Sequence, residues 1–179
     1  RLMSPFYRIR FDDGTHFDYS NDEQAMLAEV AKFSPEDVQG FQNLMKASEK
    51  CFELGFQEMG MIAFDSVAKV VKALPKLVRM KAWRSIHSMV AQYIKHPKLR
   101  IVMSFHPLLI GGNPFSVTCV YSLIHILENR WGVHSAMGGT GAIVKALVNL
   151  IKARNIPIRY NSPVTRIRVE NGEAVGVEL

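Results

Sequence analysis

One long stretch of this sequence, residues 66–127, contains no aspartate or glutamate. Twelve of the 16 acidic residues precede it, between Asp12 and Asp65, so the net charge of +6 is unevenly distributed along the chain. Any fold proposed for the chain has to explain this asymmetry. The basic residues of the stretch are Lys69, Lys72, Lys76, Arg79, Lys81, Arg84, Lys95, Lys98 and Arg100.

The second half of this stretch is apolar. Within residues 101–127 only His106 and His125 can carry charge, and the run is long enough to be considered as a membrane-spanning helix. Pro107, Gly111-Gly112 and Pro114 interrupt it, however, and these residues break helices. We therefore expect two helices joined by a Gly-Gly-Asn-Pro turn, either buried in protein or dipping into a bilayer surface.

Three interpretations of the basic half remain open. Solvated helix faces are the plainest one. Nucleic-acid binding has less support, because the basic residues do not alternate with aromatic side chains and match no nucleic-acid-binding module. Docking on an anionic membrane surface is favoured by the neighbouring apolar run, since interfacial helices combine a Lys/Arg face with a buried apolar face.

The N-terminal part predicts a hairpin followed by helices. Residues 6–19 alternate between apolar and polar side chains around Asp12-Asp13-Gly14, and an Asp-Gly pair tolerates the positive φ angles of tight turns. Asn21 or Asp22 can cap a helix over residues 22–33. Ser34-Pro35 is typical of a second helix start.

That second helix should end near Gly55 or Gly60. A basic amphipathic helix follows from Asp65 or Ser66, and Pro75 should break or kink it. A further helix is expected over residues 83–94.

After Trp131 the pattern changes to an alternation of strands and one helix. A short strand (132–137), a Gly138-Gly139-Thr140-Gly141 turn and a helix (142–152) precede three strands (156–160, 164–169 and 174–179), of which the last two form a hairpin. The glycine turn could cradle a phosphate at a helix N-terminus, but its spacing favours a purely structural role. The fold class expected is α+β.

The chemistry-bearing residues exclude several kinds of site. The six histidines show no metal-binding spacing, so no metal site is expected, and no Ser-His-Asp or Cys-His nucleophile pattern can be found. Cys51 and Cys119 are too few for a disulfide framework, which favours a reducing compartment. His106 lies in an apolar run, where a hydrogen-bonded core histidine is common, although the glycines after it allow a ligand to approach closely. Any chemistry should therefore come from a cofactor.

Four segments together resemble the bacterial phytoene desaturases, which belong to the superfamily of amine oxidases and protoporphyrinogen oxidase. The resemblance extends over nearly the whole chain and rests on motifs that occur in the same order. These motifs are Pro5-Phe6-Tyr7-Arg8, Ala82-Trp83-Arg84-Ser85, Phe105-His106-Pro107-Leu108-Leu109 with Gly111-Gly112-Asn113-Pro114-Phe115, and Gly138-Gly139-Thr140-Gly141-Ala142.

The resemblance implies two domains and a flavin. Residues 1–137 would form a substrate domain with membrane-associating helices, and residues 138–179 would be part of an FAD-binding domain. Val164 matches the position at which the superfamily contacts the adenine end of FAD through the backbone. The Gly-x-Gly-x-x-Gly unit does not occur in this sequence, so we expect the isolated chain to be unable to hold FAD and to be inactive.

The resemblance also implies a reaction, the dehydrogenation of a linear C40 polyene with hydride passing to the flavin. The expected partners are then a carotenoid and an anionic membrane surface, and binding to nucleic acid is not expected. The expected location is the cytoplasmic side of the cell membrane. Exposed strand edges could also let the isolated chain self-associate. The residues expected at the substrate are Arg100, Phe105, His106, Leu109, Gly112 and Asn113, with Arg100 as a polar or proton-handling group. Another flavin oxidoreductase of the superfamily, or a non-catalytic lipid-binding module, are the alternatives.

Overall fold

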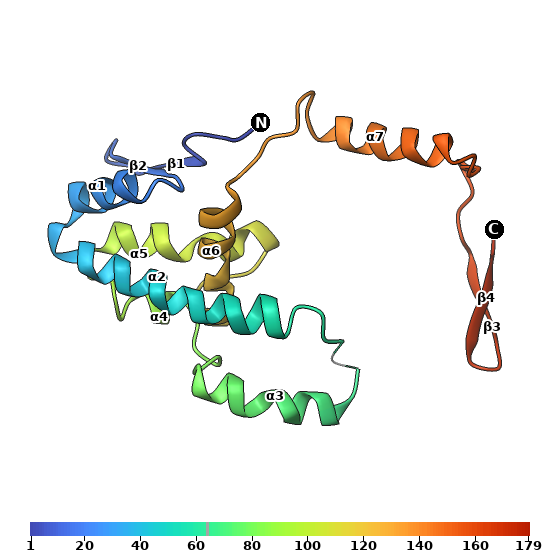
Figure 1. The fold of residues 1–179 in the computed structure, drawn as a ribbon, viewed down its shortest axis with the longest axis horizontal. Coiled ribbons are helices and arrows are strands. Elements are labelled where there is room, and N and C mark those ends of the chain that lie inside the picture. Colours follow the sequence, from blue (N-terminus) through green and yellow to red (C-terminus); the bar gives the residue numbers. More distant parts are fainter. Residues whose placement is uncertain (64) are drawn as a thin grey trace. The chain divides into compact units, whose positions relative to one another are not determined.

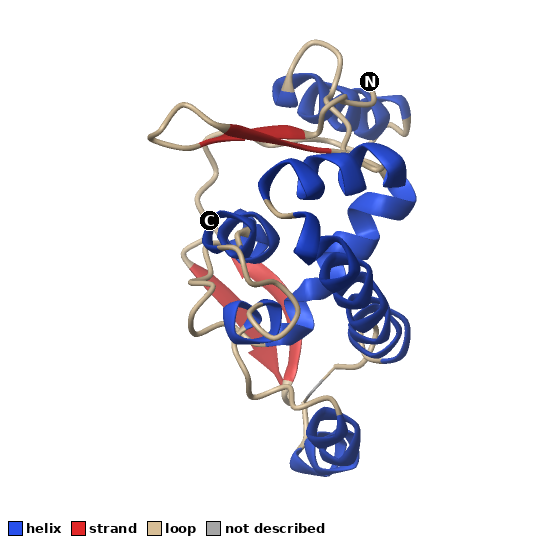
Figure 2. Cartoon of the chain, turned by 90° about the vertical axis from the view of Figure 1, so that its left-hand side faces the viewer, coloured by secondary structure: helices blue, strands red, loops and turns tan. Residues whose placement is uncertain are grey.

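The computed structural model describes residues 1–63 and 65–179. The chain divides into two compact units (Figure 1). The first unit comprises Leu2–His134, and the second comprises Ser135–Leu179 together with Arg1. Helices make up most of the regular structure, and the described residues form two separate two-stranded antiparallel sheets (Figure 2). This confirms the α+β class.

The first unit begins with the predicted hairpin. Strands β1 (Tyr7–Arg10) and β2 (His16–Tyr19) pair antiparallel, with Tyr7 opposite Tyr19 and Ile9 opposite Phe17. Gly14 adopts a φ of +82° in the turn, a conformation that glycine reaches without steric cost. Phe17 and Tyr19 are buried, so this hairpin contributes its second strand to the core.

The next two helices start where the sequence predicts. Helix α1 (Glu23–Phe33) is capped by Asp22, whose Oδ1 accepts a hydrogen bond from the Ala25 N–H at 3.0 Å. A 3-10 turn, Pro35–Asp37, leads into helix α2 (Val38–Phe52), which continues as a π-helical turn, Glu53–Glu58, and so passes Gly55 before it ends. The buried carboxylate of Asp37 accepts the backbone N–H groups of Lys95 and His96, at 2.7 and 2.8 Å.

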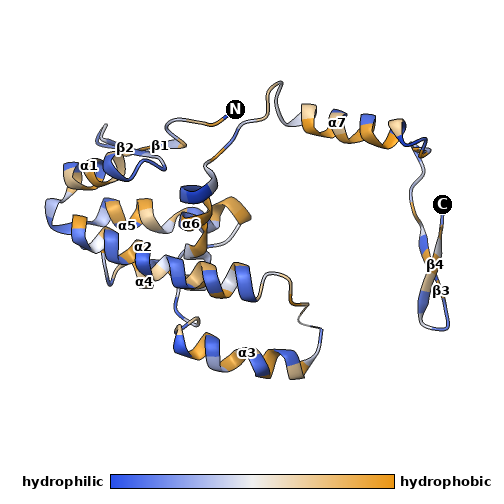
Figure 3. Ribbon diagram, in the orientation of Figure 1, coloured by the Kyte–Doolittle hydropathy of each residue, from blue (hydrophilic) through white to orange (hydrophobic). Residues whose placement is uncertain are grey.

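The basic half of the carboxylate-free stretch forms helix α3 (Val67–Arg79), helix α4 (Ile86–Val90) and the start of helix α5 (Pro97–Ser104). The helix predicted over residues 83–94 was too long, because only Ile86–Val90 is α-helical. Of the two effects predicted for Pro75, a break or a kink, the break was wrong, since α3 continues through it. Figure 3 shows apolar and charged residues alternating along α3, as in an amphipathic helix.

The apolar run divides into helical pieces around an irregular connection. After α5 come a 3-10 turn, His106–Ile110, a left-handed Gly111 (φ +72°), a second 3-10 turn, Cys119–Ser122, and helix α6 (Leu123–Trp131). Helices α5 and α6 are thus separated in sequence by a longer connection than the predicted Gly-Gly-Asn-Pro turn. Among the described residues, no helix has both the length and the apolarity that crossing a bilayer requires.

The core of the first unit comes from the hairpin and the helices around it. Helix α2 packs against α6, and α4 packs against α5 (Figure 1). The ends of the unit meet as well, because Leu2 and His134 form an antiparallel bridge and the Met3 N–H donates to the Val133 carbonyl at 2.9 Å. The main buried apolar residues are Phe17, Tyr19, Val30, Leu44, Phe52, Ile86, Val90, Ile94, Leu99, Val102 and Met103.

The second unit contains helix α7 (Thr140–Ala153) and a hairpin of β3 (Arg166–Glu170) and β4 (Glu173–Glu178). The helix and the hairpin were predicted. The strands predicted over residues 132–137 and 156–160 were wrong, since neither range forms a strand with a described partner and the first contributes only the bridge at His134. No described residue of this unit is buried, so its apolar side chains have no core of their own.

Gly40 of α2 offers a test of how tightly the first unit is packed. A Cβ atom at this position would overlap the backbone oxygen of Tyr93, which cannot move away like the end of a flexible side chain. Alanine is favoured over glycine in a helix by about 1 kcal/mol, but overpacking costs about 1–3 kcal/mol. We expect the Gly40→Ala change to lower the free energy of unfolding, as measured by urea denaturation.

Gly141→Ala is the matched control. Gly141 lies in the first turn of α7, and nothing would come within 4 Å of its added Cβ. The alanine should leave stability unchanged or raise it slightly. Equal effects at the two glycines would contradict the close approach of α2 to Tyr93.

Candidate functional site

Two of the residues expected at the substrate lie where α5 ends. Phe105 is half-buried at this end, and His106 begins the 3-10 turn with its side chain completely buried. The next part of the turn faces outward, and Leu109 keeps 58% of its surface exposed. The turn therefore joins a buried polar anchor to an exposed apolar tip.

The anchor is an interaction between His106 and Glu128 of α6. The Nε2 atom of His106 lies 3.1 Å from Oε2 of Glu128, and the hydroxyl of Tyr7 in β1 donates a hydrogen bond to the other oxygen, Oε1. One proton lies between the histidine and the carboxyl group, held by one or the other. Three segments that are distant in sequence meet at this carboxyl group.

A second histidine continues the network. The Nε2–H of His125 donates to the Met103 carbonyl at 2.9 Å, so a neutral ring has a bare Nδ1, which accepts the hydroxyl proton of Tyr19 at 2.7 Å. The rings of His106 and His125 lie 4.1 Å apart between centroids, nearly perpendicular to each other. We call Tyr7, Tyr19, His106, His125 and Glu128 the buried polar cluster.

Burial sets the protonation of this cluster. Loss of water contacts lowers the pKa of both His106 and His125 to about 3, so both rings are neutral at physiological pH. The same desolvation raises the pKa of Glu128 and raises the pKa of both tyrosines well above the ordinary value. The cluster thus favours uncharged forms, and it can hold a proton in an apolar surrounding without carrying net positive charge.

The cluster has one unsatisfied atom and one neighbouring cavity. The Nδ1 atom of His106 is buried without a hydrogen-bond partner among the described residues. Tyr19 and His125 also line an open cavity of about 570 Å³ between α1, α2 and α6. The far side of His125 is therefore close to a route by which water or a ligand can approach.

Three other expected substrate residues make hydrogen bonds or packing contacts within the first unit. The Nε–H of Arg100 donates to the Ile94 carbonyl at 2.8 Å. A Cβ on Gly112 would lie 2.7 Å from Cγ2 of Val117, so close packing requires glycine there. Asn113 accepts the Phe115 N–H at 2.9 Å and so shapes the turn.

Sequence reasoning missed four members of the cluster as site residues. Glu128 had a usable signal, because it is the first carboxylate after the carboxylate-free stretch. Tyr7 and Tyr19 could have been paired from the register of the predicted hairpin. His125 had one signal, because it and His106 are the two residues of the apolar run that can carry charge.

Val164, the expected cofactor contact, belongs to the second unit and lies in the loop before β3 with an exposed side chain. Its backbone N–H and carbonyl make no hydrogen bond to the described residues, whereas the next amide, Thr165 N–H, pairs with Glu178 at 2.9 Å. A free backbone amide and carbonyl fit the edge-on pairing that an adenine ring needs.

Comparison with known proteins gives a consistent family. Residues 3–179 match the model of the flavin-containing amine oxidoreductases. The chain is 41% identical over 177 residues to the neurosporene-forming phytoene desaturase of Cereibacter sphaeroides, covering 99% of this chain and 34% of that protein. It is 37% identical to the lycopene-forming enzyme of Pantoea ananas and 38% identical to that of a Paracoccus species, with 36% and 35% of those proteins covered. The chain thus spans about a third of the length of these curated relatives.

The buried histidines predict an acid-sensitive fold. In the unfolded chain a histidine takes up a proton below about pH 6.5, whereas His106 and His125 stay neutral in the folded state down to about pH 3. The unfolded state then binds more protons than the folded state. As the pH is lowered, the free energy of unfolding therefore decreases by up to about 1.4 kcal/mol per pH unit for each histidine. The raised pKa of Glu128 acts in the opposite sense, at pH values from about 4.3 up to the raised pKa of the folded state.

The measurement is the free energy of unfolding in urea between pH 6 and pH 5, for the wild-type chain and for His125→Gln. The variant should show a smaller pH slope, by about one proton. A slope that the substitution does not change would mean that His125 titrates in the folded state as it does in the unfolded chain.

Proposed function

Since the chain belongs to the flavin-containing amine oxidoreductase family, we propose that it is the substrate-handling part of a flavin-dependent phytoene desaturase. The observation that carries this proposal is the end-to-end similarity to phytoene desaturases, at 37–41% identity over 177 residues. The substrate would be a linear C40 polyene such as phytoene, taken from a lipid phase.

The exposed tip of the His106–Ile110 turn suits such a substrate. Leu108, Leu109 and Ile110 each expose more than half of their surface, and Phe115 follows on the same connection. Apolar contacts of this kind bind a hydrocarbon by removing its surface from water. We assign Leu109 and Phe105 to direct substrate contact. His106 and Gly112 fix the turn, and Arg100 and Asn113 support it.

The buried polar cluster gives this region its protonation chemistry. Bound FAD would supply the hydride acceptor for the dehydrogenation. The Glu128 carboxylate becomes neutral when it takes up a proton, and the Tyr19–His125 side of the cluster adjoins the open cavity. Desaturation releases a proton, so we propose that this cluster is the group nearest the turn that could relay it.

Helix α3 supports a membrane-docking role. Val67, Val71, Leu74 and Val78 are exposed on one face, while Lys69, Lys72 and Lys76 lie on the opposite face. An interfacial helix buries such an apolar face in the headgroup boundary, and its lysines favour anionic lipids. We propose that the protein acts as a peripheral protein on the cytoplasmic face of the cell membrane.

The second unit supports a share in FAD binding. We assign residues 1–137 to the substrate domain and residues 138–179 to the flavin domain, with Val164 placed to pair with the adenine through its backbone. In the isolated chain the outer edges of β3 and β4 have no described strand beside them, so we expect these edges to promote self-association.

The activity test compares two proteins. A protein of the relatives' full length that contains this chain should, when loaded with FAD, dehydrogenate phytoene supplied in vesicles, with product detected by its visible absorbance. The 179-residue chain with added FAD should give no turnover. Turnover by the short chain would refute the assignment of flavin binding to other segments, and no turnover of phytoene by the long protein would refute the substrate.

Vesicle binding tests the role of α3. Val71→Ser with Leu74→Ser should weaken co-sedimentation with anionic vesicles by about tenfold or more, because two buried apolar side chains contribute roughly 1.5–3 kcal/mol each. Ala68→Ser, on the same helix, is the control and should change little. Binding by the wild type should fall with added salt. Binding that is equal on neutral and anionic vesicles and indifferent to salt would contradict the charge argument.

A further inference from the structure

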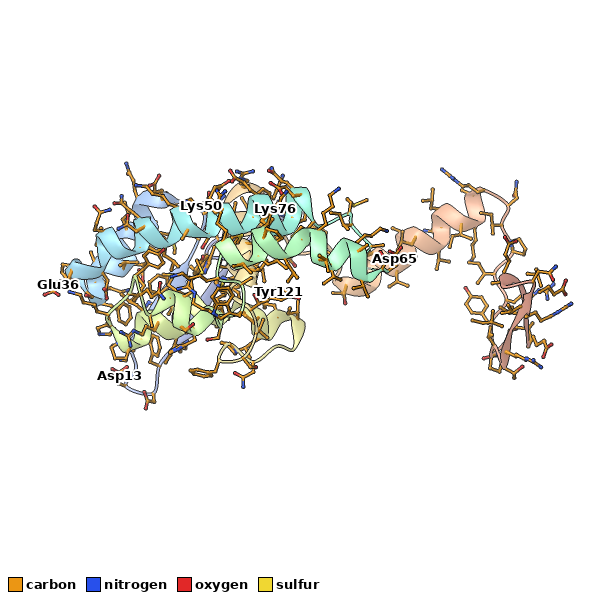
Figure 4. The ribbon with its side chains drawn as sticks, turned by 90° about the horizontal axis from the view of Figure 1, so that it is seen from below. Asp13, Glu36, Lys50, Asp65, Lys76 and Tyr121 are labelled. Carbon is orange, nitrogen blue, oxygen red and sulfur yellow. The ribbon has the colours of Figure 1, made fainter. Side chains whose placement is uncertain are left out.

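A cavity of about 480 Å³ lies between α2, α3 and α4, formed by residues other than those of the buried polar cluster. Four basic side chains line it, Lys50 from α2, Lys76 and Arg79 from α3, and Arg84 from the segment before α4. Figure 4 shows Lys50 and Lys76 along the same edge of their helices. The remaining lining residues are Ala47, Cys51, Glu53, Leu54, Glu58, Met80, Met89 and Tyr93.

The charges of this cavity do not cancel. Lys76 forms an ion pair with Glu58, which leaves Glu53 as the second carboxylate in the lining. Lys50, Arg79 and Arg84 form no ion pair with any carboxylate among the described residues. The neighbouring thiol adds no negative charge, because burial raises the pKa of Cys51 to about 11. Three cations therefore face one carboxylate, and an anion would balance the excess.

Arg84 is held in place for such a contact. Its backbone carbonyl accepts the Cys119 N–H at 2.8 Å, and its N–H donates to Lys81 at 3.0 Å. The Nε atom of its side chain is buried without a hydrogen-bond partner among the described residues. A guanidinium is planar and can donate two parallel hydrogen bonds, a geometry that matches the oxygens of a phosphate group.

We propose that this cavity binds the phosphate of an anionic phospholipid headgroup, with Arg84, Arg79 and Lys50 as its donors. The choice of a lipid rests on the docking of α3 proposed above. Interfacial helices sink about 5–10 Å into the headgroup boundary, and a helix is about 10–12 Å thick with its side chains. When the apolar face of α3 is buried, its opposite face, which carries Lys76 and Arg79, lies at headgroup level.

The apolar face of the same helix completes the geometry. Leu74, Leu77 and Val78 line a groove of about 600 Å³ with Trp83 and Leu123, and this groove is almost entirely apolar. One helix thus has a cation-rich cavity on one face and an apolar groove on the other. A headgroup in the cavity would fix α3 at a defined depth, so that the protein prefers anionic phospholipid beyond the effect of its general positive charge.

The test uses the full-length, flavin-loaded protein and two double variants of equal charge. Lys50→Gln with Arg79→Gln removes two exposed cations from the cavity. Lys69→Gln with Lys72→Gln removes two cations from α3 outside the cavity. Affinity is measured for vesicles of pure phosphatidylcholine and for vesicles containing about a quarter phosphatidylglycerol, where each basic residue near the surface adds a comparable attraction.

The cavity pair should lose at least about tenfold more affinity for the phosphatidylglycerol vesicles than the control pair, since it also loses charge-assisted hydrogen bonds. Both pairs should keep the binding to phosphatidylcholine that the apolar face provides. Equal losses in the two pairs would overturn the headgroup site while leaving membrane docking intact. No binding of any form to either vesicle would instead refute the docking itself.

Two further experiments test whether the bound phosphate belongs to a lipid and whether the effect of Arg84 is independent of the fold. Glycerophosphate in solution should compete only weakly with vesicles, and strong binding of glycerophosphate or inorganic phosphate without any effect on vesicle affinity would overturn the lipid assignment. Arg84→Lys keeps the charge but loses the paired donors. It should show an intermediate loss on phosphatidylglycerol vesicles with unchanged flavin absorbance and thermal unfolding, and wild-type affinity in this variant would contradict the role of Arg84.

Discussion

The carboxyl group of Glu128 is the interaction on which the first unit depends. It receives the hydroxyl of Tyr7 from the hairpin and contacts His106 from the end of α5, while its own backbone belongs to α6. A polar group buried without partners costs several kcal/mol, so each of the three side chains is tolerated only because the other two are in place. The packing of apolar residues brings these segments near one another, and the carboxyl group determines their register.

This dependence explains how the connection after His106, which is rich in glycine and proline, can form a defined surface. The connection after His106 contains two glycines and two prolines between residues 107 and 114 and has no long helix to support it. Its position is set by the buried ring at one end and by the short contacts of Gly112 and Asn113 at the other. The exposed leucines of the turn can therefore present a fixed apolar surface, as the proposed contact with a hydrocarbon requires, without collapsing onto the core.

Local signals predicted the elements that local interactions stabilise. The Asp-Gly turn predicted the first hairpin, and the Asp22 cap and the proline at the start of the second helix predicted α1 and α2. Predictions failed where tertiary contacts decide. Residues 83–94 look helical, but Arg84 pairs with Cys119 and the backbone of Lys95 and His96 turns to bind Asp37. The partners of Glu128 could not be inferred from sequence, because they lie 121 and 22 residues away.

Because Leu2 and His134 pair in a β-bridge, the chain enters and leaves the first unit at neighbouring points. Modules with adjacent ends are the ones that tolerate insertion into another domain, because they add a complete core without rerouting the host's strands. On the substrate role proposed above, substitutions within this module would change which hydrocarbon it binds while the fold of the rest of the protein stays the same. On the same proposal, exchanging this one contiguous block of sequence would be enough to change the substrate.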